Sequence, residues 1–305
     1  MSTADAQEVQ HPRKSPLTWV GVVAVVVLLG WVALRNIGSD SPQALSADEP
    51  GVSHVHGLGV NPADGALIVA THYGAFRIPD QGDPERIGDS YQDTMGFTVV
   101  GPDRFLGSGH PDAAGMGRGD PGRLGLIESS DAGLSWSPVS LSGQVDFHGL
   151  TVMGEHVFGW DSGTGRLMVS ADRVSWDTRS TLDLLSFAVD PADLDHLVAA
   201  ALGGLIASTD GGRSWAPREG PPLVTLSWDE TAGLWGAEAG GALWRLDEGS
   251  WAQAGQLPGT PQALLATPDA LYAAANDAEE LTGIYTSTDT GRTWDLRYRD
   301  PQQGR

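Results

Sequence analysis

The sequence predicts an all-β fold, a six-bladed β-propeller with one N-terminal transmembrane helix before it. Two observations predict the propeller: an eight-residue phrase that occurs three times, and tryptophans that recur about every 40 residues. A period of about 40 residues accommodates the four short strands and the turns of one propeller blade. A third observation, one apolar run near the N-terminus, predicts the helix.

The first 53 residues divide into a tail, an anchor and a linker. Residues 15–34 carry no charge, and a helix of that length covers about 30 Å, the thickness of a bilayer core. Trp19 and Trp31 lie near the two ends of the run, where interfacial aromatic residues are favoured. We expect a cytoplasmic tail over residues 1–16, a transmembrane signal anchor over residues 17–35 and an acidic linker over residues 36–53.

A cleaved signal peptide is the alternative interpretation of this segment. Its apolar region would usually be shorter, and no small-x-small cleavage site directly follows the run. We therefore expect a single-pass protein of the cell membrane whose large domain is extracytoplasmic.

Short apolar segments divide residues 54–299 into six units, and residues 300–305 form a tail. The segments are bounded by Gly, Pro, Asn and Asp, which is typical of short strands between turns. The units begin with HVHGL at 54, MGFTV at 95, FHGL at 147, LSFA at 185, VTLS at 224 and ALL at 263. We interpret each unit as one blade.

The repeated phrase has the pattern Ser-x-Asp-x-Gly-x-Ser/Thr-Trp and occupies residues 129–136, 208–215 and 287–294. In a tight turn the Asp and Ser oxygens can accept hydrogen bonds from turn amides, Gly permits positive φ, and Trp anchors the turn on its sheet. Weaker copies end at Trp176 and Trp251. Structural roles are expected for Asp131, Gly133, Trp136, Asp210, Gly212, Trp215, Asp289, Gly291 and Trp294.

The phrase resembles the Asp-box (BNR repeat) of sialidases and other β-propellers. Together with HVHGLGVNP, ATHYGAFRI, GSGHP and AVDPADLDHLVAA, it makes residues 54–299 similar to a bacterial family of exported Asp-box propellers often labelled glycosylhydrolase or sialidase-like. The chain is more distantly similar to photosystem assembly factors and sortilin-type propellers. The first resemblance implies a glycoside hydrolase, and the second implies binding of proteins or peptides.

Five histidines are expected on one face of the propeller. In each blade the start of the innermost strand and the end of the second strand share a face, whereas the repeated phrases lie on the opposite face. His54 and His56 begin the innermost strand of blade 1 and His148 begins that of blade 3, while His72 and His110 end second strands. His156 and His196 are expected on the other face.

Three roles are open for this group, which is expected to bind a ligand through His54, His56, His72, His110 and His148. Residues two apart in a strand point the same way, so His54 and His56 with His72 would suit a transition metal, copper or zinc. The imidazoles would equally suit an anionic ligand or acid–base chemistry. The third alternative is that each ring bonds a backbone carbonyl and closes a contact between blades.

Two further features bear on this face. Residues 110–123 form a long Gly-rich insertion, and such insertions on rigid scaffolds often carry binding residues. Residues 76–79 read FRIP, which in sialidases supplies one arginine of a carboxylate-binding triad, but Arg77 is expected in the outer half of its blade. The other groups that a sialidase needs are not assembled by the sequence.

The composition of the chain narrows the classes of partner that it is expected to bind. Cysteine is absent, so no disulfide framework holds the fold. The net charge of −21 is unfavourable for binding nucleic acid. We expect a membrane-anchored binding or assembly module for a protein, peptide or glycan outside the membrane; the alternative is a sialidase-like glycoside hydrolase that uses the same face.

Overall fold

The computed structural model describes residues 52–300. The predicted tail, the predicted anchor and almost all of the predicted linker lie outside these residues, and so do residues 301–305 of the C-terminal tail. None of the helices in residues 52–300 has the length and the apolar character needed to cross a bilayer. The description that follows concerns the propeller domain.

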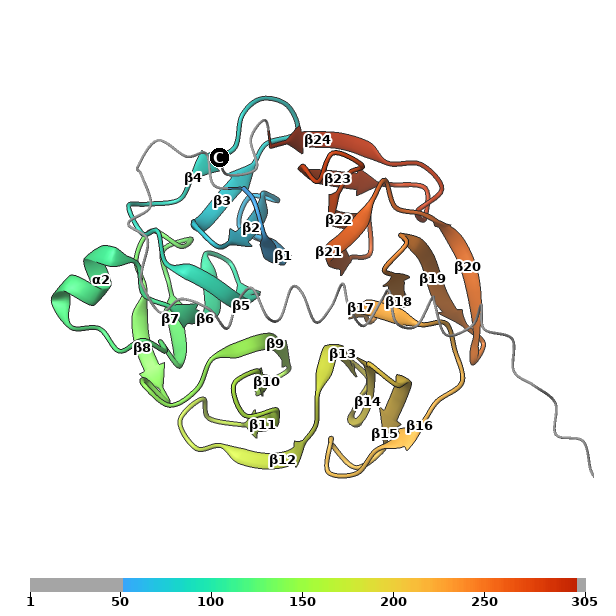
Figure 1. Cartoon of the computed structure of the whole chain (residues 1–305), viewed down its shortest axis with the longest axis horizontal. Helices are drawn as coiled ribbons and strands as arrows, with labels where there is room; N and C mark the ends of the chain where they lie inside the picture. Colours follow the sequence, from blue (N-terminus) through green and yellow to red (C-terminus); the bar gives the residue numbers. More distant parts are fainter. Residues whose placement is uncertain (1–51, 301–305) are drawn as a thin grey trace, which may run out of the picture. The chain divides into compact units, whose positions relative to one another are not determined.

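Six four-stranded antiparallel sheets surround a common centre, as Figure 1 shows, and the predicted all-β propeller with six blades is confirmed. Blades 1 to 3 contain β1 (Val55–Val60), β2 (Leu67–Thr71), β3 (Gly74–Ile78), β4 (Glu85–Arg86); β5 (Asp93–Gly101), β6 (Arg104–His110), β7 (Leu126–Ser129), β8 (Ser137–Ser140); and β9 (Phe147–Met153), β10 (His156–Asp161), β11 (Arg166–Ser170), β12 (Asp177–Thr181). Blades 4 to 6 contain β13 (Leu184–Asp190), β14 (Asp193–Ala201), β15 (Gly204–Ser208), β16 (Ala216–Pro217); β17 (Leu223–Asp229), β18 (Gly233–Glu238), β19 (Ala242–Asp247), β20 (Ser250–Gln256); and β21 (Thr260–Ala266), β22 (Leu271–Asn276), β23 (Thr282–Ser287), β24 (Asp295–Arg299).

Each blade is one contiguous segment of chain, and its first strand is the innermost. The ring therefore closes without exchange of a strand between the first and last blades. Closure relies on packing of Val55 and Leu67 against Ala263 and Ile284. It also relies on a 2.9 Å hydrogen bond that the Val55 amide donates to the Gln262 side chain.

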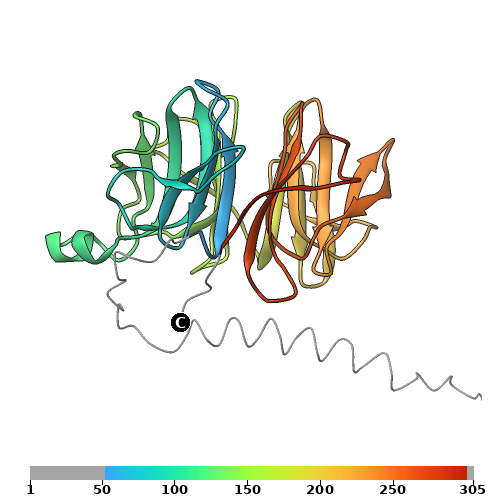
Figure 2. The same cartoon turned by 90° about the horizontal axis from the view of Figure 1, so that it is seen from above.

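The hydrophobic core lies in the seams between neighbouring blades, which stand side by side in Figure 2. Burial of apolar side chains between sheets is the main favourable contribution to folding. Five tryptophans, spaced by the predicted period, each pack on the core of a different seam: Trp136 between blades 1 and 2, Trp176 between 2 and 3, Trp215 between 3 and 4, Trp251 between 4 and 5, and Trp294 between 5 and 6. These rings are half-buried.

The three repeated phrases form turns between the third and fourth strands of blades 2, 4 and 6. In the second copy, Ser208 Oγ donates to Asp210 Oδ1 at 2.8 Å and accepts from the Gly212 amide at 2.9 Å. Asp210 Oδ1 also accepts from the Ser214 amide at 2.9 Å. Ser129 with Asp131 and Ser287 with Asp289 make the same bonds.

A bulge recurs at the start of the innermost strand of every blade. In blade 1, Val55 pairs with Thr71 and Gly57 pairs with Ala70, so His56 between them has no partner in the ladder. Skipped residues occupy the same place in all six blades: His56, Met95, His148, Leu185, Val224 and Gln262. Because a bulge re-aims the side chain of its extra residue, this regularity determines what surrounds the centre of the ring.

Candidate functional site

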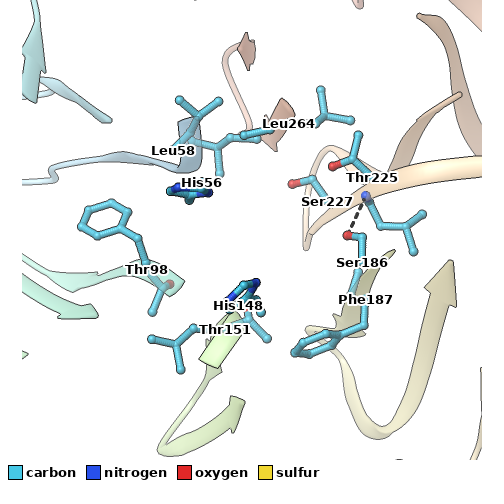
Figure 3. Close-up of a pocket in the computed structure, with 18 of the residues that line it drawn as sticks. His56, Leu58, Thr98, His148, Thr151, Ser186, Phe187, Thr225, Ser227 and Leu264 are labelled. Carbon is cyan, nitrogen blue, oxygen red and sulfur yellow. Dashed lines mark hydrogen bonds between the residues drawn. The ribbon is translucent and has the colours of Figure 1, made fainter. Parts of the chain in front are cut away.

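All six bulged residues line one cavity at the centre of the ring, of about 540 Å³. Apart from Trp160 of β10, the rest of its wall comes from the innermost strands and combines hydroxyl groups with apolar side chains (Figure 3). The hydroxyl groups belong to Thr98, Thr151, Ser186, Thr225 and Ser227. Among residues 52–300, the lining contains no arginine, lysine or carboxylate.

Antiparallel order fixes which end of the cavity the bulges occupy. The innermost strand of a blade begins at this end, the second strand returns to it, and the turn after the third strand lies at the other end. The six bulged residues therefore form a mouth on the face opposite the repeated-phrase turns. The mouth is polar at His56, His148 and Gln262 and apolar at Met95, Leu185 and Val224.

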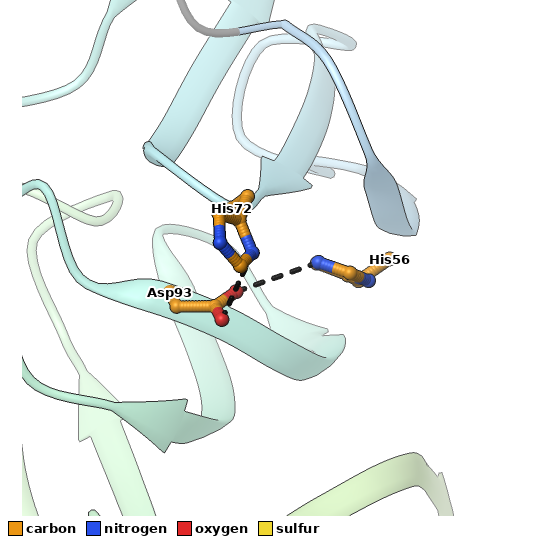
Figure 4. Close-up of side chains that lie close together, drawn as sticks. All are labelled: His56, His72 and Asp93. Atoms are coloured by element: carbon orange, nitrogen blue, oxygen red, sulfur yellow. Dashed lines mark ion pairs between the residues drawn. The ribbon is translucent and has the colours of Figure 1, made fainter. Parts of the chain in front are cut away.

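Two carboxylates beside this mouth each hold two histidines. The first group, the Asp93 cluster, contains His56, His72 and Asp93. His72 Nδ1 lies 3.0 Å from Asp93 Oδ2, and His56 Nε2 lies 3.4 Å from Asp93 Oδ1 (Figure 4). Asp93 begins β5 of blade 2, whereas both histidines belong to blade 1, so the cluster bridges the seam.

The second group, the Asp146 cluster, contains His110, Asp146 and His148. Both Nε2 atoms lie near the same oxygen, Asp146 Oδ2: that of His110 at 3.1 Å and that of His148 at 2.9 Å. His110 Nδ1 is 2.7 Å from the Gly122 carbonyl oxygen. His110 ends β6 of blade 2, while Asp146 and His148 begin blade 3, so this cluster bridges the next seam.

The environment shifts the pKa values of Asp93, His72, Asp146 and His110 toward their charged forms. Burial opposes ionisation of Asp93, but its contacts with His56 and His72 outweigh burial and lower its pKa to about 2. The contact with Asp93 raises the pKa of His72, although burial opposes this. In the second cluster the contact with Asp146 raises the pKa of His110 to about 9. Burial likewise opposes ionisation of Asp146, and contacts with His110 and His148 hold its pKa well below the usual range.

His54 lies beside the Asp93 cluster but outside the strand. The strand begins one residue later, and His54 adopts φ of 54°, a left-handed conformation that is uncommon for residues other than Gly. The centroid of its ring is 6.1 Å from that of His72. Burial, followed by the neighbouring His72 and His56 rings, lowers the pKa of His54.

The structure thus divides the five histidines expected on this face. His54, His56 and His72 gather around Asp93, and His110 and His148 gather around Asp146. The remaining pair of described histidines is at the other end of the strands. His156 begins β10 next to the turn after β9, and His196 contacts Asp190 at 3.1 Å near the turn between β13 and β14.

Sequence reasoning missed Asp93 and Asp146, which hold the histidines together, and Gln262, which lines the mouth beside them. A signal for the two carboxylates was present, since each precedes an apolar segment that opens a blade. Alignment of the blade openings would have placed both at the start of an innermost strand. The bulge that aims His56 and His148 has no comparable sequence signal, because it is a difference in pairing register.

The Gly-rich insertion after His110 contains a short helix, α2 (Ala113–Arg118), which projects from the ring in Figures 1 and 2. The Asp112 carboxylate caps it by accepting from the Gly115 amide at 2.7 Å, and its other oxygen accepts from the Tyr91 amide at 3.0 Å. Arg118 pairs with Asp120 within the insertion. These contacts are internal to the insertion or made to the neighbouring loop, and a binding role for the insertion stays a prediction.

The FRIP segment lies in β3, the third strand of blade 1. Arg77 pairs with Asp64, which is in the turn between β1 and β2 at the end of the blade away from the mouth. A carboxylate-binding arginine at the central cavity would have to lie in its lining, and Arg77 does not.

Comparison with known proteins gives a fold and a distant relative. No protein-family model matches the chain. The chain is 27% identical over 202 residues to the dispase autolysis-inducing protein of Streptomyces mobaraensis, a match that covers 65% of this chain and 48% of the relative.

Solved structures that are similar include a glycoside hydrolase and part of a protein complex. The GH74 xyloglucanase from Xanthomonas campestris has a TM-score of 0.53 and 20% identity, over 83% of this chain and 46% of that chain. A chain of the nidogen/laminin complex has a TM-score of 0.58 and 13% identity, over 77% of this chain and 95% of that chain.

These likenesses show a β-propeller fold and leave the function to be argued from the site. The chain spans about half the length of the Streptomyces relative and of the xyloglucanase.

Proposed function

We propose that the protein is a membrane-anchored, extracytoplasmic β-propeller of the Asp-box type that binds a protein, peptide or glycan at the mouth of its central cavity. The observation that carries the proposal is the ring of six bulged residues. Each of these residues is skipped by the pairing of its strand, and all six line one cavity from six different blades. Concave sites with mixed apolar and polar linings are typical of ligand-binding pockets.

The composition of the cavity favours binding over hydrolysis. Glycoside hydrolysis usually requires two carboxyl groups on either side of the scissile bond, and the lining described here consists of hydroxyl, imidazole, amide and apolar groups. Asp93 and Asp146 lie beside the mouth, each in contact with two histidines. The nidogen/laminin neighbour is a propeller found with a protein partner, which accords with this role.

Glycoside hydrolysis is the alternative function. It is favoured by the similarity to a xyloglucanase and by the presence of two carboxylates at the rim of one cavity. In this alternative, Asp93 and Asp146 would have to part from their histidines to act on a sugar.

The membrane anchor and the Asp-box assignment rest on the sequence. The uncharged run at residues 15–34 supports the anchor, and the three Ser-x-Asp-x-Gly-x-Ser/Thr-Trp phrases support the Asp-box type. Membrane fractionation followed by N-terminal sequencing tests the anchor. A product that begins near Ala47 and stays in the soluble fraction would contradict it.

The binding role is tested with the full chain in detergent on peptide and glycan arrays. Leu185→Ser changes an apolar position of the mouth, and Leu134→Ser is its control, because Leu134 is 60% exposed in a turn on the opposite face. We expect a ligand that binds the wild-type protein and Leu134→Ser but is weakened about tenfold or more by Leu185→Ser. Equal binding by both variants contradicts the proposed site, and release of sugar from an arrayed glycan supports the hydrolase.

A further inference from the structure

We propose that His56, His72 and Asp93 form a binding site for a divalent transition-metal ion of the zinc or copper class. The inference deepens the proposed function, because it names a ligand for the face that carries the mouth. It does not require that a macromolecule or glycan occupies the cavity.

The spacing of the ligand atoms matches that of a metal site. One nitrogen from each histidine and one Asp93 oxygen lie within 4.8 Å of one another. Two ligands about 2.0–2.1 Å from a tetrahedral ion are separated by roughly 3.3 Å. The two histidine–carboxylate separations involve different oxygens of Asp93: His72 Nδ1 lies 3.0 Å from Oδ2 and His56 Nε2 lies 3.4 Å from Oδ1, and both values are close to this separation (Figure 4).

Unused hydrogen-bonding capacity in the cluster points to an ion. His56 Nε2 and Asp93 Oδ1 face each other and are buried, yet neither atom makes a hydrogen bond. Buried polar atoms are nearly always satisfied, and those that are not commonly mark an ion or a functional group. An ion between the two atoms would satisfy both at once.

The ligand set selects the class of ion. Two imidazole nitrogens and one carboxylate oxygen suit zinc, copper or iron, whereas calcium and magnesium prefer oxygen ligands. Three protein ligands leave at least one coordination position open. The His72 side chain is 48% exposed, so an exogenous ligand has access to the ion from that side, and the His54 ring is adjacent.

The backbone places these ligands from two blades. The bulge aims His56, and the tight connection between β2 and β3 presents His72, whose amide donates to the His54 carbonyl at 3.3 Å. The connection is braced because Thr71 Oγ1 donates to the Gly74 carbonyl at 2.9 Å and accepts from the Tyr73 amide at 3.0 Å. A braced connection keeps the His72 ring close to Asp93 before any ion binds.

The Asp146 cluster offers a built-in comparison. Both of its histidines use Nε2 on one oxygen of Asp146, and His110 Nδ1 is engaged by the Gly122 carbonyl. Among the described residues, the nitrogen and oxygen atoms of this cluster do not gather closely enough to hold one ion. His148 also occupies the bulge that is equivalent to that of His56. His148→Ala is therefore a control matched in residue type, position and contact with a carboxylate.

The test uses the full chain in detergent, without a polyhistidine tag and stripped with a chelator. Titration calorimetry with Zn²⁺ and Cu²⁺ at neutral pH is compared for the wild-type protein, His56→Ala, His72→Ala, Asp93→Asn and His148→Ala. We expect one ion per chain, an affinity lower by roughly 100-fold or more in the first three variants, and little change in His148→Ala. The Cu²⁺ electron paramagnetic resonance spectrum is expected to show coupling to the two imidazole nitrogens.

Two results would overturn the metal site: no binding by the wild-type protein, or equal losses in His56→Ala and His148→Ala. Circular dichroism of each variant separates loss of the site from loss of the fold, and Asp93→Asn keeps the side-chain volume. Array binding repeated in chelator separates the two proposals. If the metal site fails but an array ligand still binds in chelator, the proposed function stands without the metal site. If a metal binds but no array ligand is found, the metal site stands without the proposed function.

Discussion

Asp93 and His110 are direct partners across the β5–β6 pair, yet their side chains join different clusters. The Asp93 carboxylate contacts histidines of blade 1, and the His110 ring contacts the carboxylate of blade 3. Blade 2 therefore supplies a negative group to one seam and a positive group to the next. The proximity of Asp93 also helps to raise the pKa of His110, after the larger effect of Asp146.

The charge of His110 predicts a pH dependence of stability. Its pKa of about 9 exceeds the ordinary value of 6.5, so its stabilising contribution is complete below pH 6.5 and is lost as the pH rises through about 9. His72, whose pKa is also raised, acts in the same direction. Because the His110 side chain is 43% exposed, solvent screening reduces the effect.

We expect the free energy of unfolding, measured by urea titration in chelator, to fall between about pH 6.5 and 9. In His110→Gln the decrease should be smaller, since only His72 and groups elsewhere still titrate. The expectation fails if His110→Gln and the wild-type protein show the same slope.

Trp215 is predicted to stabilise the seam between blades 3 and 4. It packs on Phe158, Leu167 and Leu197, and its indole N–H donates to Ser180 Oγ at 3.1 Å. Trp215→Ala should lower the free energy of unfolding by about 3 kcal/mol through lost packing, and Trp215→Phe by less. Denaturant titration of both variants is the measurement, and an unchanged midpoint for Trp215→Ala would assign the ring another role.

Gly212 is predicted to be required in its turn. It has φ of +84°, and a Cβ atom would lie 2.5 Å from Leu167 Cδ2 of the preceding blade. Gly212→Ala should therefore destabilise the protein by roughly 1–3 kcal/mol. Gly203→Ala is the control, because nothing lies within 4 Å of the added Cβ, and its effect should stay within about 0.5 kcal/mol. Thermal melts that rank the two variants equally would contradict this account.

Gln262 is predicted to hold the ring closed. Its side chain accepts from the buried Val55 amide at 2.9 Å and donates to Asn276 Oδ1 at 2.6 Å. Gln262→Ala leaves the amide unsatisfied, which should cost about 1–3 kcal/mol. Amide hydrogen exchange should speed up in β1 and β21 but not in β9 on the other side of the ring. If amide exchange speeds up equally in all six blades, Gln262 does not act specifically at the contact between the first and last blades.

The fold could be predicted from the sequence because its signals are local and repeated. The phrase that ends at Trp215 carries its own turn, and the recurring tryptophans give the blade length. The histidines could be sorted by face for the same reason, since strand order within a blade decides which end a residue occupies.

The grouping around Asp93 and Asp146 could not be predicted in the same way. It depends on contacts between blades, on a skipped residue at each bulge and on the left-handed conformation of His54. These are properties of register and three-dimensional packing, which a single sequence does not state. The predicted strand geometry would have placed His54 and His56 on one side of a strand, whereas the strand begins after His54.

The recurrence of the bulge in all six blades has a consequence for how such a protein can change. A residue skipped by the ladder can be replaced without altering the pairing of its neighbours. Apart from Gln262, whose side chain also bonds the Val55 amide, these positions therefore carry exchangeable side chains on a constant frame. Three of them are now polar and three apolar, and that ratio can shift one blade at a time. A new specificity at this face would therefore require only a few substitutions, with no insertion, no altered loop and no change in the number of blades.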